Sequence, residues 1–191
     1  MNRVKPLCIL LAASLFLLGG CAKTELSRTS PGSPGADSGQ PAADQAETIS
    51  FEAVDMEGNT VTADVFSETE LTMVNVWATY CRPCLQEMPG LGELAGEYES
   101  EEFQILGIIS DVPESVKPET LELVAELIEK TGADYPHLLL NRSLNDSLLT
   151  DVTAVPTTFF IDKDGRVLET VIGAMEKSAW EEKINGFLEK E

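Results

Sequence analysis

The chain has 191 residues and a formal net charge of −20, because 33 acidic side chains outnumber 13 basic ones. The length suits one folded domain with additional segments, and so acidic a chain repels phosphate backbones, which excludes nucleic acid as an expected partner. The four cysteines are too few for a small disulfide-rich scaffold, so their positions matter more than their number: Cys8, Cys21, Cys81 and Cys84.

The N-terminal residues have the layout of a secretory signal. Two basic residues precede an apolar run over 6–18, and two glycines and Cys21 follow it. This run is shorter than the roughly 20 residues that cross a bilayer. The ending LGGC resembles a bacterial lipobox, which implies cleavage before Cys21 and a lipid on its thiol that holds the protein at a membrane. We therefore expect a lipoprotein signal peptide over 1–20, with an ordinary cleaved signal or an uncleaved anchor as alternatives.

The next segment has the composition of a flexible linker. Ser, Pro, Gly, Ala and Asp dominate residues 22–47, and one leucine is the only large apolar residue among them. Such a segment cannot bury a core, and its average reach is about 25–30 Å. We expect residues 21–47 to be the lipidated N-terminus and linker of a folded domain over 48–191.

The folded domain is predicted to begin with a β-hairpin near Ile49. Its two extended segments, within ISFEAVDMEGNTVTADVF, flank a turn signal at Gly58-Asn59. Residues 71–77 form a near-continuous apolar run, which predicts a buried strand of a sheet covered on both faces. After Cys81 the apolar side chains recur every three to four residues, which predicts a helix.

The rest of the domain continues the alternation of strands and helices. The expected elements are a buried strand over 103–110, a helix from Pro118 to Gly132, a short strand over 137–140, a strand over 157–162 with an Asp-Gly hairpin turn into its neighbour, and a last helix with Trp180, Ile184, Phe187 and Leu188 on its core face. A crossover helix requires parallel strands and the late hairpin requires antiparallel ones. We predict an α/β fold with a central mixed sheet, helices on both faces and an N-terminal β-hairpin.

The two cysteines of the motif CRPC, Cys81 and Cys84, lie where a buried strand passes into a helix. Structural zinc needs four ligands, and the chain offers this one pair and a single histidine, His137, which we expect to be a packing or surface residue. A permanent disulfide across two residues would restrain little entropy. Cycling between dithiol and disulfide suits the position, because unpaired N–H groups at a helix N-terminus lower a thiol pKa.

The roles within the pair follow from the order of the residues. Cys81 would be the nucleophile, because it caps or begins the helix and is the more exposed sulfur. Cys84, one turn later, would attack the mixed disulfide formed at Cys81. Arg82 would add positive potential beside Cys81, and Pro83 would stiffen the first helical turn, where a missing N–H costs nothing.

The stretch VNVWATYCRPCLQEMP resembles the active site of the thioredoxin superfamily, in particular its TlpA/ResA-like branch. A second match, VPTTFFIDKDG, begins at Val155, about 70 residues further on and on the expected element. The resemblance covers residues 48–191. It implies a thioredoxin-like fold, a redox-active disulfide between Cys81 and Cys84, and a cis proline, Pro156, beside these cysteines.

Other positions bear on the same branch. Asn75 stands where cytoplasmic thioredoxins typically carry a buried aspartate, and an amide cannot shuttle a proton. A glutamate at the position of Glu87 lies near the cysteines in the TlpA/ResA-like branch, so we expect Glu87 to raise a cysteine pKa when ionised or to relay its proton; a solvated helix residue is the alternative. Trp77 and Tyr80 are expected either to be walls of the docking groove, with Val155, or to be core and surface aromatics.

These features predict a membrane-anchored, extracytoplasmic thiol–disulfide oxidoreductase that reduces disulfides of client proteins. No NADPH- or flavin-binding pattern is present, so we expect no cofactor and electrons from a partner. The resemblance implies a CcdA-like membrane electron donor and clients such as apocytochrome c or methionine sulfoxide reductases. The alternatives are an oxidant that forms disulfides, a peroxiredoxin-like thiol peroxidase, and a lipoprotein adaptor whose redox site is vestigial.

Overall fold

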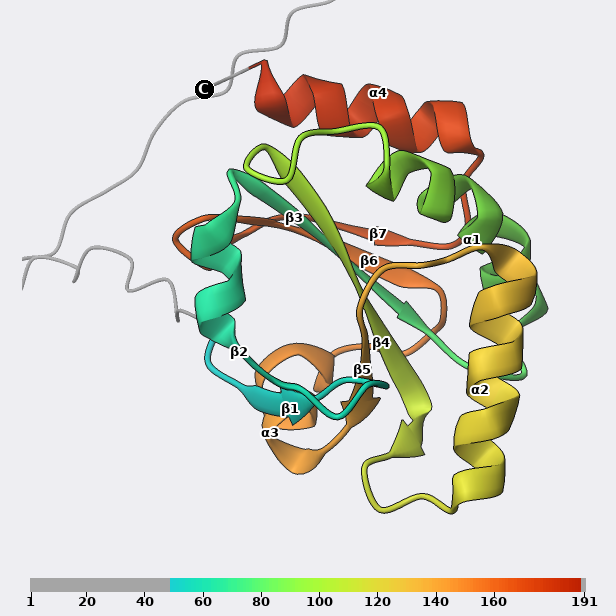
Figure 1. Ribbon diagram of the computed structural model, residues 1–191. Coiled ribbons are helices and arrows are strands. Elements are labelled where there is room, and N and C mark those ends of the chain that lie inside the picture. Colours follow the sequence, from blue (N-terminus) through green and yellow to red (C-terminus); the bar gives the residue numbers. More distant parts are fainter. Residues whose placement is uncertain (1–48, 190–191) are drawn as a thin grey trace, which may run out of the picture. The chain divides into compact units, whose positions relative to one another are not determined.

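The computed structural model describes residues 49–189, so the predicted signal peptide, the linker and Cys21 lie outside the described residues. The domain is built on a five-stranded sheet in the order β5-β4-β3-β6-β7, with helices packed around it (Figure 1). Within the described part of the chain, no helix has the length and apolar character needed to cross a membrane.

The central strand, β3 (Leu71–Trp77), decides the character of the sheet. It pairs in parallel with β4 (Phe103–Pro113) and antiparallel with β6 (Thr157–Asp162). The outer pairs follow the same division, β4 parallel with β5 (His137–Leu140) and β6 antiparallel with β7 (Val167–Ile172). All seven residues of β3 are buried, as its apolar run predicts for a strand covered on both faces. The predicted mixed sheet is confirmed.

The two faces of the sheet are covered by different kinds of element. The three long helices, α1 (Arg82–Ala95), α2 (Pro118–Thr131) and α4 (Lys177–Leu188), share one hydrophobic core with one face. On the other face a second core forms beneath the N-terminal hairpin and short helical segments. These are β1 (Glu52–Val54), β2 (Thr60–Thr62), η1 (Ala63–Glu68), α3 (Arg142–Leu144) and η2 (Asn145–Leu149). The prediction of helices on both faces is therefore confirmed.

Most of the expected elements lie where their end signals place them, with two differences. The hairpin's second segment ends early, because the Thr62 side chain accepts a hydrogen bond from Asp64 N and starts the 3₁₀ helix η1 instead of a longer strand. The strand expected over 103–110 continues to Pro113, with a register shift against β5 after Ile109. The charged Asp111 hides this continuation from a search for apolar runs.

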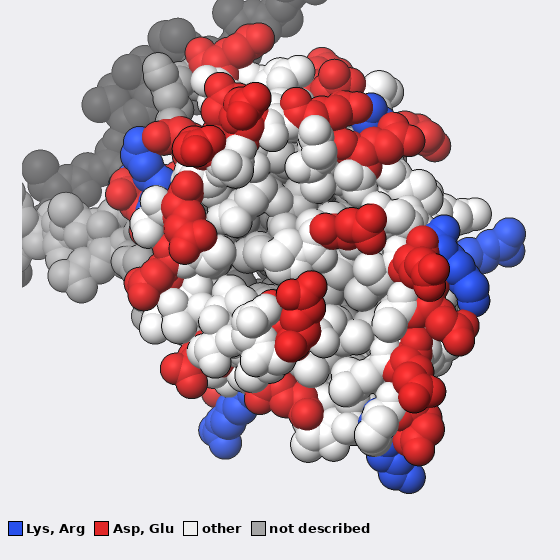
Figure 2. All heavy atoms as spheres, viewed as in Figure 1, with Lys and Arg blue, Asp and Glu red and all other residues white. Residues whose placement is uncertain are grey.

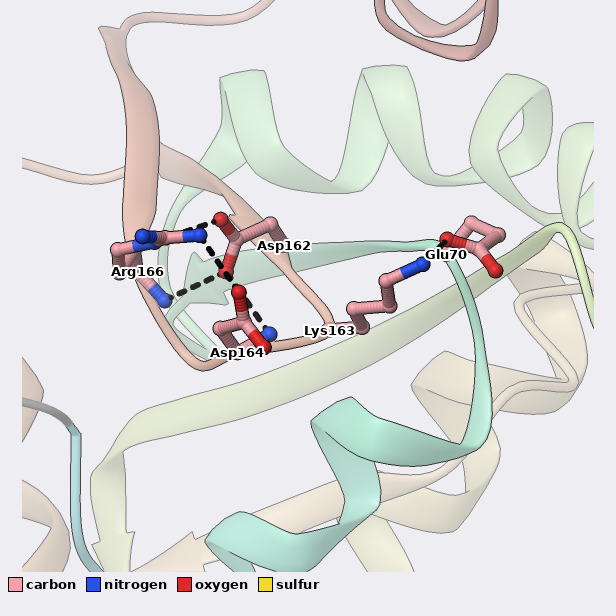
Figure 3. A network of polar contacts seen from close by, with 5 residues as sticks. All are labelled: Glu70, Asp162, Lys163, Asp164 and Arg166. Carbon is pink, nitrogen blue, oxygen red and sulfur yellow. Dashed lines mark hydrogen bonds and ion pairs between the residues drawn. The ribbon is translucent and has the colours of Figure 1, made fainter. Parts of the chain in front are cut away.

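The predicted Asp-Gly turn joins β6 to β7, with Gly165 at φ 76°. The Asp162 carboxylate accepts hydrogen bonds from the backbone N–H groups of Asp164 and Arg166 and from the Arg166 side chain (Figure 3). Lys163 pairs with Glu70, just before β3, at 2.6 Å. Exposed ion pairs add little stability each, but the hydrogen bonds within the turn fix the register of β6.

Helices α1 and α2 approach each other closely at a glycine. A Cβ atom added at Gly92 would collide with the carbonyl oxygen of Gly132, the residue that ends α2 in the left-handed conformation at φ 64°. A backbone atom cannot move away as the end of a long side chain can, so the helices would have to separate.

We expect Gly92→Ala to lower the free energy of unfolding by about 1–3 kcal/mol, because it forces α1 away from α2. The matched control is Gly186→Ala in α4, where an added Cβ has nothing within 4 Å. Alanine is the better helix former, so the control should raise stability by up to about 1 kcal/mol. Urea unfolding of both variants measures the contrast, and an equal gain in both would contradict the close packing at Gly92.

Candidate active site

The CRPC motif lies at the N-terminus of α1, directly after β3. Cys81 is the N-cap residue, and its Sγ accepts a hydrogen bond from Cys84 N at 3.2 Å. The two cysteines form a disulfide, with their Cα atoms 5.3 Å apart. Cys84 is fully buried and Cys81 is 5% exposed, so a partner in solution would meet Cys81 first.

The two residues between the cysteines are exposed on the first turn of α1. Among the lysines and arginines of residues 49–189, Arg82 and Lys117 alone make no ion pair. Acidic side chains dominate the face seen in Figure 2, with few basic ones between them. Arg82 thus places a positive charge on the redox motif that no neighbouring carboxylate neutralises.

The second motif meets the first at the same end of the sheet. The peptide bond between Val155 and Pro156 is cis, and Pro156 is buried directly before β6. Val76 of β3 pairs with Thr157 of β6, so the segment leading to Cys81 and the segment containing Pro156 leave neighbouring strands side by side.

A hollow of about 250 Å³ lies between these two segments. Tyr80 and Val155 line it from the two motifs, together with Ser110, Leu149 and Thr153. Tyr80 is 77% exposed, whereas Trp77 has none of its surface exposed. The sequence left open whether Tyr80 and Trp77 are walls of a docking groove or ordinary core and surface aromatics. Tyr80 borders this hollow, whereas Trp77 does not and belongs to the core.

Glu87 is buried behind the cysteines, with 5% of its surface exposed, so the alternative of a solvated helix residue is wrong. Its Oε1 accepts a hydrogen bond from Asn75 Nδ2 at 3.0 Å, and its Oε2 accepts one from Met175 N at 3.2 Å. Burial raises the pKa of the Glu87 carboxyl, while Asn75 and Met175 N oppose the rise by stabilising the charged form. The indole N–H of Trp180 also favours that form, although it makes no hydrogen bond of ordinary geometry.

Glu87 also borders a hollow at the surface of the domain. A hollow of about 260 Å³ lies between α1 and the segment before α4, and Glu87, Gln86 and Met175 line it. Asn75 in turn donates to Thr158 Oγ1 at 3.1 Å. Glu87 therefore lies between a buried amide on the central strand and an opening to water.

Two polar side chains of this region were missed by the sequence analysis. Thr158 lies two residues after Pro156, inside the second motif, and its burial could have been inferred from its place on a central strand. Asp111 accepts hydrogen bonds from Thr79 N and Thr79 Oγ1. Its position at the carboxyl end of a parallel strand, where sites of α/β sheets gather, is the signal that could have found it.

A CxxC disulfide at a helix N-terminus, on a mixed sheet and beside a cis proline, defines a thioredoxin-like thiol–disulfide oxidoreductase. The model of the AhpC/TSA family matches residues 43–170, and the chain belongs to that family. It is 29% identical over 144 residues to the thiol-disulfide oxidoreductase ResA of Bacillus thuringiensis, covering 75% of this chain and 76% of the relative. The predicted enzyme class and the TlpA/ResA-like resemblance are confirmed.

Solved structures share the fold. A thiol:disulfide interchange protein of the thioredoxin family from Chlorobium tepidum TLS superposes with a TM-score of 0.62 at 24% identity, covering 78% of this chain and 99% of that one. The pneumococcal exposed lipoprotein thioredoxin from Streptococcus pneumoniae strain TIGR4 superposes with a TM-score of 0.55 at 26% identity, covering 72% and 98%. The thioredoxin-like fold predicted from the sequence is confirmed.

The single histidine supports the core beneath the site. His137 is buried, and its Nε2 lies 2.9 Å from Ala133 O, which can only accept, so Nε2 carries the proton. Nδ1 is then free to accept the hydrogen bond from Trp77 Nε1 at 3.1 Å. Its imidazole lies against Gly107, where a Cβ atom would collide with it. The prediction of a packing residue is correct, and burial lowers the pKa of His137 to about 4.

We expect His137 to make the protein less stable in acid. The unfolded chain binds a proton at His137 below its usual pKa of about 6.5, whereas the folded chain resists protonation down to about 4. Between pH 7.5 and pH 4.5 this difference removes about 2–3 kcal/mol of stability.

His137→Gln removes the titrating group and keeps an acceptor for Trp77. Between pH 7.5 and pH 4.5 the free energy of unfolding should therefore fall by about 2–3 kcal/mol less in the variant than in the wild type. Urea unfolding of both proteins at the two pH values measures the difference. The same pH dependence of stability in both proteins would contradict the conclusion that buried His137 resists protonation.

Proposed function

We propose that the protein is a membrane-anchored, extracytoplasmic reductant of disulfides in client proteins. The observation that supports this most strongly is the Cys81–Cys84 pair at the N-terminus of α1, with Cys84 fully buried and Cys81 5% exposed. Such a pair can form a mixed disulfide with a client at Cys81 and then resolve it by attack of Cys84.

The reduced protein begins the reaction at Cys81. Its thiolate attacks one sulfur of a client disulfide, the client S–S bond breaks, and the other client sulfur leaves as a thiolate that takes up a proton. The Cys84 thiolate then attacks Cys81 Sγ and displaces the remaining client sulfur, which also takes up a proton. Two electrons pass to the client, and the Cys81–Cys84 disulfide remains in the protein.

The N-terminus of α1 favours the thiolate of Cys81. Cys84 N lies 3.2 Å from Cys81 Sγ, and the unpaired N–H groups of a first helical turn carry partial positive charge. Pro83 lacks such a donor but stiffens the turn. Arg82, without an ion pair, adds positive potential, which solvent weakens at an exposed site.

Cys84 has to lose its proton where no solvent reaches it, and we assign this task to Glu87. The carboxyl lies one turn further along the same helix, and its raised pKa suits it to take up and release a proton. The hollow on its far side offers the path to water. Pro156 and Val155 would hold the client chain on the other side of Cys81, with Tyr80 as the exposed wall.

The location and partners are extensions of the same proposal. A lipid on Cys21 would anchor the protein and residues 22–47 would hold the domain above the membrane; the similarity to a protein described as an exposed lipoprotein supports this. Electrons would come from a CcdA-like membrane protein. Disulfide-bearing proteins outside the cytoplasm, such as apocytochrome c or methionine sulfoxide reductases, are the clients that we propose.

The reduction potential of the Cys81–Cys84 pair tests the direction of electron flow. We expect equilibration in glutathione or dithiothreitol buffers to give about −250 mV or lower, as for thioredoxin-like reductants. A value above about −150 mV would make the protein a disulfide donor and overturn the proposal.

Matched serine variants are the control for the same experiment. Cys84→Ser should accumulate a mixed disulfide with a protein substrate such as insulin, because nothing resolves it, whereas Cys81→Ser should form none. A Cys81→Ser protein that retained its function in cells would favour the adaptor alternative.

We expect Glu87→Gln to slow the second step of the reaction. The reduced protein releases two thionitrobenzoate ions from Ellman's reagent, the first by attack of Cys81 and the second by attack of Cys84. Loss of the proton acceptor should slow the second phase at neutral pH at least about 10-fold.

The pH profile of that second phase distinguishes the roles of the carboxyl. In the wild type the rate should fall as the pH drops through the raised pKa of Glu87, and this dependence should vanish in the variant. Glu122→Gln, the same change at an exposed position of α2, is the control and should leave both phases unchanged. An unaltered second phase in Glu87→Gln would reject the relay.

A further inference from the structure

The nucleophile is connected to the sheet by a short segment that is itself outside the sheet. β3 ends at Trp77, and α1 begins after Cys81. Cys81 N donates to Ala78 O at 3.0 Å, which closes a turn around Thr79 and the exposed Tyr80. The place of Cys81 at the helix N-cap therefore depends on what holds this turn.

In the described part of the chain, one side chain bonds to the turn at Thr79, and it is that of Asp111. Thr79 N donates to Asp111 Oδ1 and Oδ2 at 3.0 and 3.2 Å, and Thr79 Oγ1 donates to Oδ2 at 2.6 Å. The neighbouring Ser110 Oγ donates to Trp77 O at 2.9 Å. Two consecutive residues of β4 thus hold the end of β3 and the turn that follows it.

The irregularity in β4 explains why the side chains of Ser110 and Asp111 point toward the end of β3. The pairing of β4 with β5 shifts register between Ile109 and Pro113, and such a bulge re-aims the side chains within it. Val112 is buried in the core beside the exposed Asp111. Burial of Val112 fixes the bulge, and the bulge turns Asp111 toward the Cys81 segment.

The carboxylate of Asp111 is committed to this turn. It makes no ion pair with any lysine or arginine among residues 49–189. Its charge is met instead by the N–H and O–H donors of Thr79, and hydrogen bonds to a charged group are about twice as strong as neutral ones. The same negative charge, which is bonded to Thr79 two residues before Cys81, also disfavours a thiolate at Cys81. The hydrogen bonds and the charge of Asp111 therefore act on the Cys81 thiolate in opposite directions.

We propose that Asp111 is a positioning residue for the exchange reaction: by bonding Thr79 from the β4 bulge, it keeps Cys81 at the helix N-cap, where its thiolate is stabilised. This inference rests on the proposed role of Cys81 as the nucleophile. Asp111 itself touches no substrate and transfers no proton.

The test separates the two effects of Asp111 by two substitutions in the full chain. Asp111→Ala removes both the hydrogen bonds and the charge, whereas Asp111→Asn keeps an acceptor for Thr79 N and an amide that can bond Thr79 Oγ1. The readout is the rate at which iodoacetamide alkylates Cys81 in the reduced protein as a function of pH, with the Cys81 peptide followed by mass spectrometry. Glu122→Ala, which removes an exposed carboxylate of α2, is the control for charge.

We expect Asp111→Ala to slow alkylation of Cys81 at pH 7 about threefold or more and to move the midpoint of the pH profile upward. Asp111→Asn should react at least as fast as the wild type, because the turn is kept and a negative charge is lost. Thr79→Val, which loses the hydroxyl but keeps the backbone donor, should lie between the wild type and Asp111→Ala, and it carries the test where Asp111→Ala does not fold. Alkylation of Asp111→Ala or, failing that, Thr79→Val at the wild-type rate, or equal slowing in Asp111→Ala and Asp111→Asn, would overturn the inference.

This test is independent of the client. Alkylation of Cys81 requires only the reduced protein, so a shift in Asp111→Ala stands even where the wild type fails to reduce protein disulfides, and then only the proposed function is lost. A wild type that reduces insulin, with no shift in the Asp111 variants, leaves the proposed function in place and removes the positioning role.

Discussion

A carboxyl group inside an apolar core has to be held by hydrogen bonds, because an ionised or unpaired group there is costly. Glu87 meets this requirement with donors from two different elements, Asn75 on β3 and Met175 in the segment before α4. The central strand, α1 and the approach to α4 are thereby fastened to one side chain. Because Cys84 lies one turn before Glu87 on the same helix, the geometry of the redox pair depends on this arrangement.

The central strand is fastened on its other sides by the same kind of contact. Asn75 also donates to Thr158 of β6, and Trp77 donates to His137 of β5. These contacts tie β3 to its neighbour β6 and, past β4, to β5. The turn that follows is held differently, by the carboxylate of Asp111 at the surface, and this turn leads directly to Cys81. The nucleophile that we propose, Cys81, thus lies at the boundary between the packed core and the surface from which a client would approach.

The sequence predicts those features that are encoded locally. The apolar run of β3, the proline and glycine at the ends of α2 and the Asp-Gly turn after β6 each carry their own signal, and each element lies where it was expected. The features that were missed depend on distant residues. Asp111 becomes meaningful only once the β4 bulge turns it toward Thr79. For Trp77 the sequence left two alternatives open, and its contact with His137, 60 residues away, accompanies the core position that the structure shows.

Glu87 shows the limit of local reasoning most clearly. On a helical pattern alone it is one polar residue among others, and only the resemblance of the CRPC motif to the TlpA/ResA-like branch placed it near the cysteines. Its burial follows from Asn75, a polar residue within an otherwise apolar strand. A polar residue in such a run predicts a buried partner, but the identity of that partner is decided by the packing of α1 against the sheet.

β7 is one of the two edge strands of the five-stranded sheet, and Val167, Leu168 and Ile172 are exposed on it. An open edge is a template for pairing with another chain, including a second copy of the same protein. The acidity that repels nucleic acid also makes copies repel one another, and this repulsion weakens once salt shortens its range to about 10 Å or less. The excess of carboxylates thus opposes self-association at this edge, and a higher ionic strength is expected to weaken that opposition.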